Sequence, residues 1–225
     1  MMPTAIKLKS KHAVIKPAVK IYLSPDQHTE MMARASWQLF CSEVDELSIG
    51  AQVLTEYVKE RTSEQFTLPL NAHIPCLIGS ALGITDFSIL ERATKAHLYL
   101  DAFTQFLDDV ADKQNDAPIR SHIACELLAV GVGQMLELKQ GAHTIPFIAI
   151  HDAISKAMKA ERTLWSLRTK PRAYSNEESQ LIADRGGVLL AVTRALAYST
   201  GQLSVLPALE KAILNGALAI QLIDE

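Results

Sequence analysis

YLDAFTQFLDDVAD, residues 99–112, places four acidic side chains in an otherwise apolar helical run. On an α-helix Asp112 lies about 40° around the axis from Asp108 and about 6 Å along it, so both carboxylates project from one face. Asp101 and Thr104 fall near the same stripe. The opposite face is apolar and suits a protein core; it carries Leu98, Leu100, Phe103, Phe106, Leu107 and Val110. The stretch therefore predicts a buried helix with one acidic stripe.

The acidic stripe needs a source of positive charge. Close carboxylates repel one another, and burying them ionised without a counter-charge is costly. A bound cation removes both costs, and Mg²⁺ suits hard oxygen ligands and often completes its shell with substrate phosphates. The D-D-x-x-D pattern formed by Asp108, Asp109 and Asp112 is thus a candidate metal-mediated anchor for a diphosphate. The alternative is a solvent-exposed helix end, because residues 113–116 are all polar.

Composition narrows the class of protein. The chain has 225 residues, is 48% hydrophobic and carries a net charge of −3, which favours one large domain at 24–225 after a flexible basic arm at 1–23. Dispersed Lys and Arg residues offer no basic patch for nucleic acid. The N-terminus is not followed by an apolar signal sequence, and charged residues interrupt the longest apolar runs. Cys41, Cys76 and Cys125 are widely spaced and predict buried thiols. We expect a cytoplasmic protein without stable membrane insertion.

Prolines, glycines and N-cap residues divide the rest of the chain into helical segments. Pro75 is among the prolines expected to open a segment, and Asp86 and Asn176 are predicted N-caps. Gly83, Gly141 and Gly201 are the predicted helix stops. The pair Gly186-Gly187 indicates either a helix break or close helix packing. No alternating strand pattern occurs, so the class is all-α with more helices than a four-helix bundle. The predicted helices cover 24–47, a stretch on to 61, 73–82, 86–112, 120–139, 146–167, 176–200 and 207–225.

The last predicted helix carries a second acidic ending. It closes with Gln221, Asp224 and Glu225 after a long apolar run. Gln221 and Asp224 are one turn apart and share a face. A frayed acidic terminus is the alternative interpretation. Two apolar helices, far apart in sequence, nevertheless both end in acidic pairs, which favours a shared site.

In their order along the chain, these segments resemble the trans-polyprenyl diphosphate synthases and the wider class I isoprenoid synthases. PCLIGSALG at 75–83 is similar to a conserved helix of that family, and 108–112 is an intact first aspartate-rich motif. Residues 177–190 resemble the segment with the family's K-T motif, with Arg185 in place of Lys. Residues 221–225 are similar to the start of the second motif, Q-x-x-D-D, with Glu in place of the last Asp.

The resemblance implies an isoprenoid-synthase-type helical bundle around a central cavity. Asp108, Asp112 and Asp224 would hold three Mg²⁺ ions together with a prenyl diphosphate, and the protein would be a homodimer. The implied catalytic residues are Asp108, Asp109, Asp112, Arg185 and Gln221. The implied substrate contacts are Phe103, Thr104, Arg120, Arg185 and Gln221, with Phe103 narrowing the hydrocarbon tunnel.

Departures from the family separate three hypotheses. The positions before Pro75, which bind the second diphosphate in chain-elongating relatives, carry no cation here. Relatives also continue for several helices beyond the second motif, so the domain is expected to be incomplete at its C-terminus. The leading hypothesis is a terpene synthase that ionises one allylic prenyl diphosphate. A short-chain prenyltransferase adding isopentenyl diphosphate is the alternative, and would need cations such as Lys159 or Arg162. A non-catalytic regulatory or partner-binding relative is the third.

Overall fold

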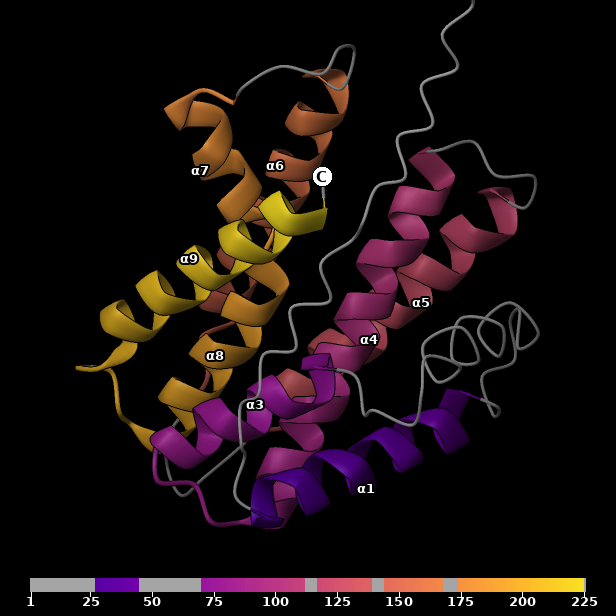
Figure 1. The fold of residues 1–225 in the computed structure, drawn as a ribbon. Coiled ribbons are helices and arrows are strands. Elements are labelled where there is room, and N and C mark those ends of the chain that lie inside the picture. Colours follow the sequence, from indigo (N-terminus) through magenta and orange to yellow (C-terminus); the bar gives the residue numbers. More distant parts are fainter. Residues whose placement is uncertain (1–26, 45–69, 112–116, 139–143, 168–173, 225) are drawn as a thin grey trace, which may run out of the picture.

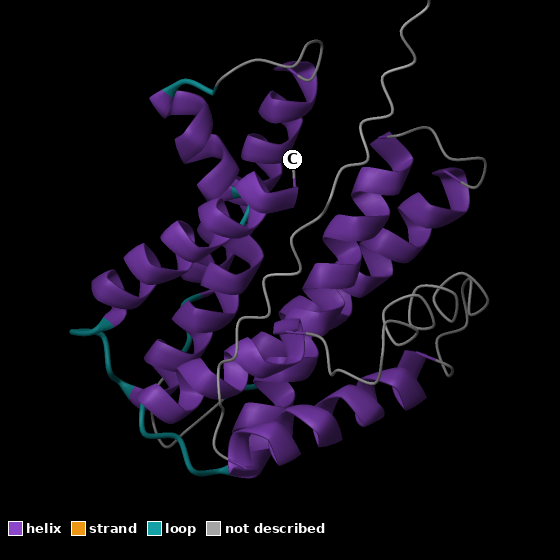
Figure 2. Ribbon diagram, viewed as in Figure 1, coloured by secondary structure: helices purple, strands orange, loops and turns teal. Residues whose placement is uncertain are grey.

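The computed structural model describes residues 27–44, 70–111, 117–138, 144–167 and 174–224. Within these ranges the chain forms eight α-helices and no strand, which confirms the all-α class (Figures 1 and 2). The 1–23 arm, the predicted helical stretch up to 61 and the predicted helix stop at Gly141 lie outside the described residues. The helices are α1 (Gln27–Val44), α3 (Leu70–Ala81), α4 (Phe87–Ala111), α5 (Ala117–Leu136), α6 (Phe147–Leu167), α7 (Asn176–Asp184), α8 (Gly187–Thr200) and α9 (Leu206–Asp224).

The helices form two groups that α8 joins. In the first group α1, α3 and α5 pack against α4, and α4 with α5 is the most extensive helix pair. In the second group α6 packs on α8 and α7, while α9 packs on α7 and α8. Helix α8 also contacts α4, α3 and α5. In Figure 1 the groups diverge toward the C-terminal ends of α4 and α6, and the last turns of α9 point into the space between them.

Helix α4 lies at the centre of the core because its apolar face is buried as predicted. Leu98, Leu100, Phe103 and Phe106 are each at most 4% exposed. The other two residues of the predicted apolar face, Leu107 and Val110, are only partly buried. On the α1 side, the ring centroids of Tyr99 and Phe40 lie 5.0 Å apart with an edge-on geometry. The same side holds an ion pair of 2.7 Å between Lys95 Nζ and Glu43 Oε1. The acidic stripe therefore lies on the helix at the centre of the core.

Several predicted helix ends are confirmed. The backbone N–H of Ser88 donates to Asp86 Oδ1 at 2.9 Å, as expected for an N-cap. Gly83 and Gly201 follow α3 and α8 with φ of 72° and 71°, the left-handed conformation that ends a helix. The side-chain amide of Gln202 donates to the Leu82 carbonyl at 2.9 Å, which links these two helix ends.

Three helix-end predictions are wrong. Pro75 lies inside α3 rather than at its opening, because the packing of Ala72, Cys76 and Ile78 in the core offsets the backbone hydrogen bond that proline cannot make. Ser175, not Asn176, caps α7: Glu178 N–H donates to Ser175 Oγ at 3.2 Å, and Ser175 N–H donates to Glu178 Oε2 at 2.8 Å. The predicted helix at 176–200 is two helices, which meet at residues 185–186.

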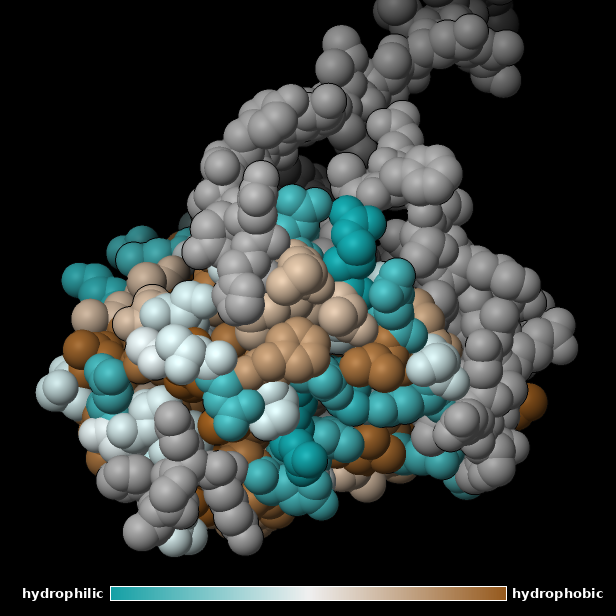
Figure 3. All heavy atoms as spheres, turned by 90° about the horizontal axis from the view of Figure 1, so that it is seen from below, coloured by the Kyte–Doolittle hydropathy of each residue, from teal (hydrophilic) through white to brown (hydrophobic). Residues whose placement is uncertain are grey.

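The prediction of three buried thiols is also wrong in part. Cys76 is buried, and its Sγ lies 3.3 Å from Thr94 Oγ1. Cys41 is partly buried and Cys125 is exposed, because Cys125 lies on the face of α5 that borders a surface groove. Figure 3, which views the molecule from the α1 side, shows hydrophobic atoms interspersed with hydrophilic ones. Among the described helices, none combines the length and the apolar character that crossing a bilayer requires.

Candidate functional site

The junction between α7 and α8 sets the position of Arg185. A Cβ atom added to Gly187 would lie 2.4 Å from the Ala153 carbonyl oxygen of α6, and one added to Gly186 would lie 2.7 Å from Ala217 Cβ of α9. Only glycine fits at either place without a shift of its neighbours. The Gly186-Gly187 pair, which directly follows Arg185, therefore marks both a helix break and close packing.

Arg185 joins the two helix groups through two carboxylates. Its Nε lies 2.5 Å from Glu161 Oε2 of α6, and its Nη2 lies 3.5 Å from Asp108 Oδ2 of α4. The three side chains are 15%, 23% and 27% exposed, in the order Arg185, Glu161 and Asp108. The structure thus brings together two residues that the sequence assigned to one site, and adds a third from α6.

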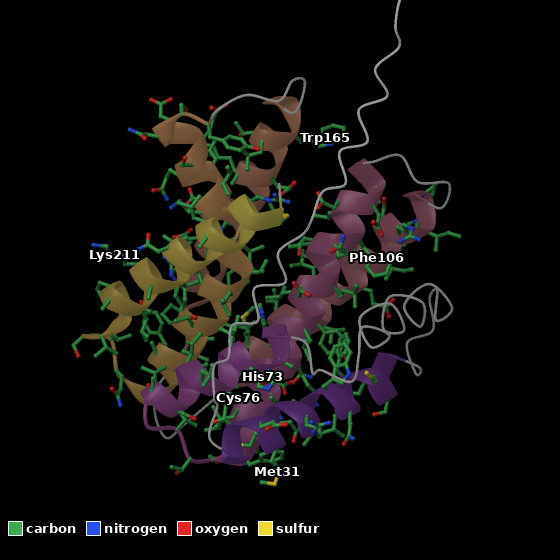
Figure 4. All side chains as sticks on the ribbon, viewed as in Figure 1. Met31, His73, Cys76, Phe106, Trp165 and Lys211 are labelled. Carbon is green, nitrogen blue, oxygen red and sulfur yellow. The ribbon has the colours of Figure 1, made fainter. Side chains whose placement is uncertain are left out.

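Asp109 and Arg120 form a separate ion pair at the end of α4. Arg120 lies near the start of α5, and its guanidinium carbon sits 5.6 Å from the centroid of the Phe106 ring, in the range of a cation–π contact. Phe106 is labelled in Figure 4. The side chains of Arg120 and Asp109 are only 17% and 20% exposed. This pair fixes the α4–α5 corner, so the charge of Arg120 is largely engaged by Asp109. A role for either residue in substrate binding or catalysis stays a prediction.

The other predicted site residues are only partly covered by the structure. Phe103 is 4% exposed within the core, and the Thr104 hydroxyl donates to the Asp101 carbonyl at 2.8 Å. A role for Phe103 as the floor of a tunnel, and for Thr104 as a substrate contact, stays a prediction. Asp112 lies outside the described residues, as do the side chains of Gln221 and Asp224 in the last turn of α9.

Glu161 belongs to none of the motifs that the sequence contains. A signal for it exists in the α6 pattern, because Ala157 and Leu164 are one turn away on either side and are 1% and 6% exposed. A carboxylate on such an apolar stripe requires a cationic partner. Nothing in the sequence identifies that partner as Arg185, since the pairing depends on how α6 packs against the α7–α8 junction.

The described residues fit a Mg²⁺ ligand at Asp108. This carboxylate supplies a hard oxygen donor, remains partly exposed and already binds a cationic group, the Arg185 guanidinium. No group of three or more His, Cys, Asp or Glu that could hold a metal ion is gathered among the described residues. Mg²⁺ usually takes only one or two protein carboxylates, so Asp108 suits that ion as a single described ligand.

A surface groove of about 580 Å³ runs between α5 and α6. Its walls are mainly apolar, with Leu128 and Val132 on α5 and Phe147, Ile154 and Met158 on α6. Lys159 and Arg162 also line it, whereas Asp108 and Arg185 do not. The cations that a chain-elongating enzyme would need therefore face this groove instead of joining the Asp108–Arg185 pair.

Comparisons with known proteins found no match that could guide the assignment of a function. No protein-family model matches the chain, and no curated protein or solved structure matches it significantly. The resemblance to the isoprenoid synthases accordingly rests on the motif residues and on their order along the chain.

Proposed function

We propose that this protein is a Mg²⁺-dependent class I isoprenoid-diphosphate enzyme that ionises an allylic prenyl diphosphate, in the manner of a terpene synthase. The observation that carries the proposal is the contact between Asp108 and Arg185 across the two helix groups. One belongs to the aspartate-rich motif and the other replaces the lysine of a later motif. Their meeting places an anionic and a cationic group where one metal–diphosphate ligand would need both.

The chemistry assigns a separate task to each side chain. Bound Mg²⁺ would neutralise the charge that develops on the departing diphosphate. Asp108 would hold the ion from α4. Arg185 would bind a phosphate oxygen, and its planar guanidinium can do so with two parallel hydrogen bonds, which a lysine cannot. Phe103 and its apolar neighbours on α4 would keep water from the carbocation.

A terpene synthase is favoured over a chain elongator by the placement of the cations. A second diphosphate requires its own cluster of positive charge, and Lys159 and Arg162 line the α5–α6 groove instead. A single allylic diphosphate requires only the Asp108–Arg185 side of the molecule. The elongating and non-catalytic alternatives predict different results in the same turnover assays.

Turnover assays test the proposed function. The purified protein is incubated with Mg²⁺ and geranyl, farnesyl or geranylgeranyl diphosphate, each with and without isopentenyl diphosphate, and diphosphate release and hydrocarbon products are measured. We expect terpene products from an allylic substrate alone. Asp108→Asn should lower the rate by about a hundredfold or more, since loss of metal-assisted charge stabilisation removes several kcal/mol. Glu177→Gln, an exposed change in the first turn of α7, is the matched control and should keep full activity.

The other outcomes have distinct meanings. Longer diphosphates formed only in the presence of isopentenyl diphosphate would identify a prenyltransferase. No diphosphate release from folded protein with any substrate would reject both catalytic functions and leave the non-catalytic relative.

We also propose that the protein is a homodimer that pairs through α5 and α6. The groove between these helices is flanked by exposed apolar side chains: Leu136, Phe147, Ile148 and Trp165 are 37%, 56%, 61% and 44% exposed. In Figure 4 Trp165 projects from α6 on the side of the α4–α5 pair. Exposed apolar side chains beside a groove are typical of a protein–protein interface.

The charges on α6 favour a second copy of the same chain as the partner. Asp152 and Lys159 are about two turns apart, hence on one flank of the helix, and both are exposed. A twofold axis near Ser155 would set α6 antiparallel to its copy and place each Asp152 beside the other chain's Lys159. Such reciprocal pairing is the mark of a symmetric interface.

Charge exchange tests the dimer. Sedimentation of the native protein should give the dimer mass. Lys159→Asp and Asp152→Lys should each shift the protein toward monomer, and the double exchange should restore the dimer. Lys211→Asp, a change at an exposed site on α9, should have no effect (Figure 4). A monomer at all concentrations, or a dimer that neither single exchange weakens, would reject this interface.

A further inference from the structure

We propose that Glu161 is a positioning residue: it holds the guanidinium of Arg185 and thereby limits how strongly Arg185 competes with a divalent cation for Asp108. The inference rests on the proposed function, because it concerns the same site. It goes further in assigning a role to a residue of α6 that none of the sequence motifs contains.

The geometry gives Arg185 a primary and a secondary partner. Glu161 Oε2 forms an ion pair with Nε at 2.5 Å, whereas Asp108 Oδ2 lies 3.5 Å from Nη2. Charge-assisted hydrogen bonds at the shorter distance are much the stronger. Glu161 therefore fixes the Nε edge of the planar guanidinium, and this directs an Nη group toward α4.

The surroundings hold the backbone at Arg185, so that any adjustment must occur in its side chain. The backbone on its C-terminal side cannot shift freely, because Gly187 lies against Ala153 and Ala157 of α6. The neighbouring carboxylate of Asp184 does not compete for Arg185, since its Oδ1 is paired with Lys156 Nζ at 2.9 Å and with the Gln180 amide at 2.9 Å. Glu161 is thus the carboxylate in closest contact with Arg185 among the described ion pairs.

Because Arg185 contacts both Asp108 and Glu161, a cation that binds Asp108 replaces the contact of the guanidinium with Asp108 and leaves the contact with Glu161. When a divalent cation takes the Asp108 carboxylate, Arg185 keeps its bond to Glu161, and its charge is not left uncompensated. The Nη group that faced Asp108 can then bind a phosphate oxygen. Without the charge of Glu161, the ion pair between Arg185 and Asp108 would strengthen, and a cation would have to displace this stronger pair.

A double-mutant cycle tests this competition. The affinity for Mg²⁺ alone, and for Mn²⁺ alone, is measured by isothermal titration for wild type, Glu161→Gln, Arg185→Gln and the double variant. Glu161→Gln should weaken binding by about 3- to 10-fold, the range expected for one redistributed charged hydrogen bond. Arg185→Gln should tighten binding. The double variant should match Arg185→Gln, because Glu161 acts only through Arg185.

Two results would overturn the inference. If Glu161→Gln weakens cation binding equally in the presence and absence of Arg185, Glu161 is itself a metal ligand. If it lowers only the melting temperature and leaves cation affinity unchanged in both backgrounds, its role is structural. Glu161→Asp, which keeps the charge on a shorter arm, should bind cations more tightly than Glu161→Gln, and it serves for the comparison if Glu161→Gln does not fold.

A second readout separates this inference from the proposed function. In ¹⁵N-labelled protein the Arg185 Nε–H resonance should lie downfield because of the close contact of Nε with the Glu161 carboxylate, should persist in Asp108→Asn and should move upfield in Glu161→Gln. If it behaves in this way but wild type binds no divalent cation, Glu161 holds Arg185 while the metal-dependent function fails. If the resonance is the same in Glu161→Gln as in wild type, the inference fails whatever the turnover assays give.

Discussion

The position of Arg185 depends on the close packing of Gly187, two residues further along the chain. The missing Cβ of Gly187 lets the start of α8 lie against the backbone of α6, at a place where a methyl group would be 2.4 Å from the Ala153 carbonyl oxygen. A neighbour of this kind is part of a helix backbone and cannot rotate away. The position of the site thus depends on a residue that has no functional group.

Gly187→Ala should destabilise the protein. The added methyl group must push α6 and α8 apart, and overpacking of this kind costs about 1–3 kcal/mol. Urea unfolding followed by circular dichroism measures the change in the free energy of unfolding. Gly133→Ala is the matched control: nothing lies within 4 Å of its added Cβ, and it should be neutral or stabilising by up to about 1 kcal/mol. Equal effects of the two changes would contradict the close packing.

His97 should make stability depend on pH. Burial lowers the pKa of this histidine below its usual 6.5, and the Asp101 carboxylate opposes the shift only in part. The unfolded chain therefore takes up a proton at a higher pH than the folded chain does. The contribution to stability is complete above about pH 6.5 and is lost as the pH falls below it.

Unfolding free energies measured between about pH 5 and 8 test the role of His97. The acid-side decline should be smaller in His97→Gln than in wild type, whatever the effect of the substitution at neutral pH. His122→Gln, a change at an exposed site on α5, should leave the decline as it is. The same slope in wild type and in His97→Gln would show that other groups cause the decline.

At the scale of elements, α7 is the shortest helix described and depends most on its N-terminus. Its capping box joins Ser175 and Glu178 in both directions, and Glu178 is buried. A nine-residue helix gains little from its own backbone bonds, because helix nucleation is costly. The cap and the packing on α6 and α9 therefore hold the segment that ends at Arg185.

Ser175→Ala should lower stability by about 1 kcal/mol, the usual cost of losing an N-cap side chain. Asn176→Ala is the matched control, because Asn176 lies inside the helix and should contribute much less. Hydrogen exchange should localise the loss of protection to α7. A larger effect from Asn176→Ala than from Ser175→Ala would restore the assignment of the cap made from sequence alone.

The helices could be predicted from local chemistry, and their exceptions could not. Proline, glycine and capping residues indicated most of the helix bounds, and the two left-handed glycines ended α3 and α8 as expected. The position of Pro75 was predicted wrongly because the packing of α3 outweighs the local preference of proline for the start of a helix. Ser175 and Asn176 are both good N-cap residues, and only the partner at Glu178 distinguishes them. Asp108 and Arg185 could be selected from sequence, whereas Glu161 required the packing of α6 on the α7–α8 junction.

At the scale of the whole molecule, α8 connects the two helix groups, and Arg194 is its main polar anchor within the second group. Its Nε lies 2.6 Å from Glu210 Oε1 of α9, and its Nη1 donates to the Ala149 carbonyl of α6 at 2.9 Å. One side chain thereby joins three helices. In the sequence it could be recognised only as a charge that interrupts an apolar run.

Arg194→Met should destabilise the protein by about 1.5–3 kcal/mol, the range for hydrogen bonds to a charged, partly buried group. Methionine keeps most of the aliphatic stem, so the change reports the lost polar contacts. Thermal and urea unfolding measure it. Arg34→Met removes an exposed pair with Glu30 within α1 and should cost less than about 0.5 kcal/mol. Similar losses for the two variants would contradict the anchoring role.

The hydrogen bond from Gln202 to the Leu82 carbonyl has a consequence for the order of folding. It closes a loop of 120 residues, so the chain must be synthesised at least as far as Gln202 before the bond can form. Helices α1, α3, α4 and α5 contact one another earlier and more locally, and they can assemble while α8 is still inside the ribosome. The joining of the two helix groups is then the late, slow event. Until it occurs, the apolar surface of α4 and α3 that α8 will cover stays open to aggregation, and a chaperone would protect the nascent chain at that stage.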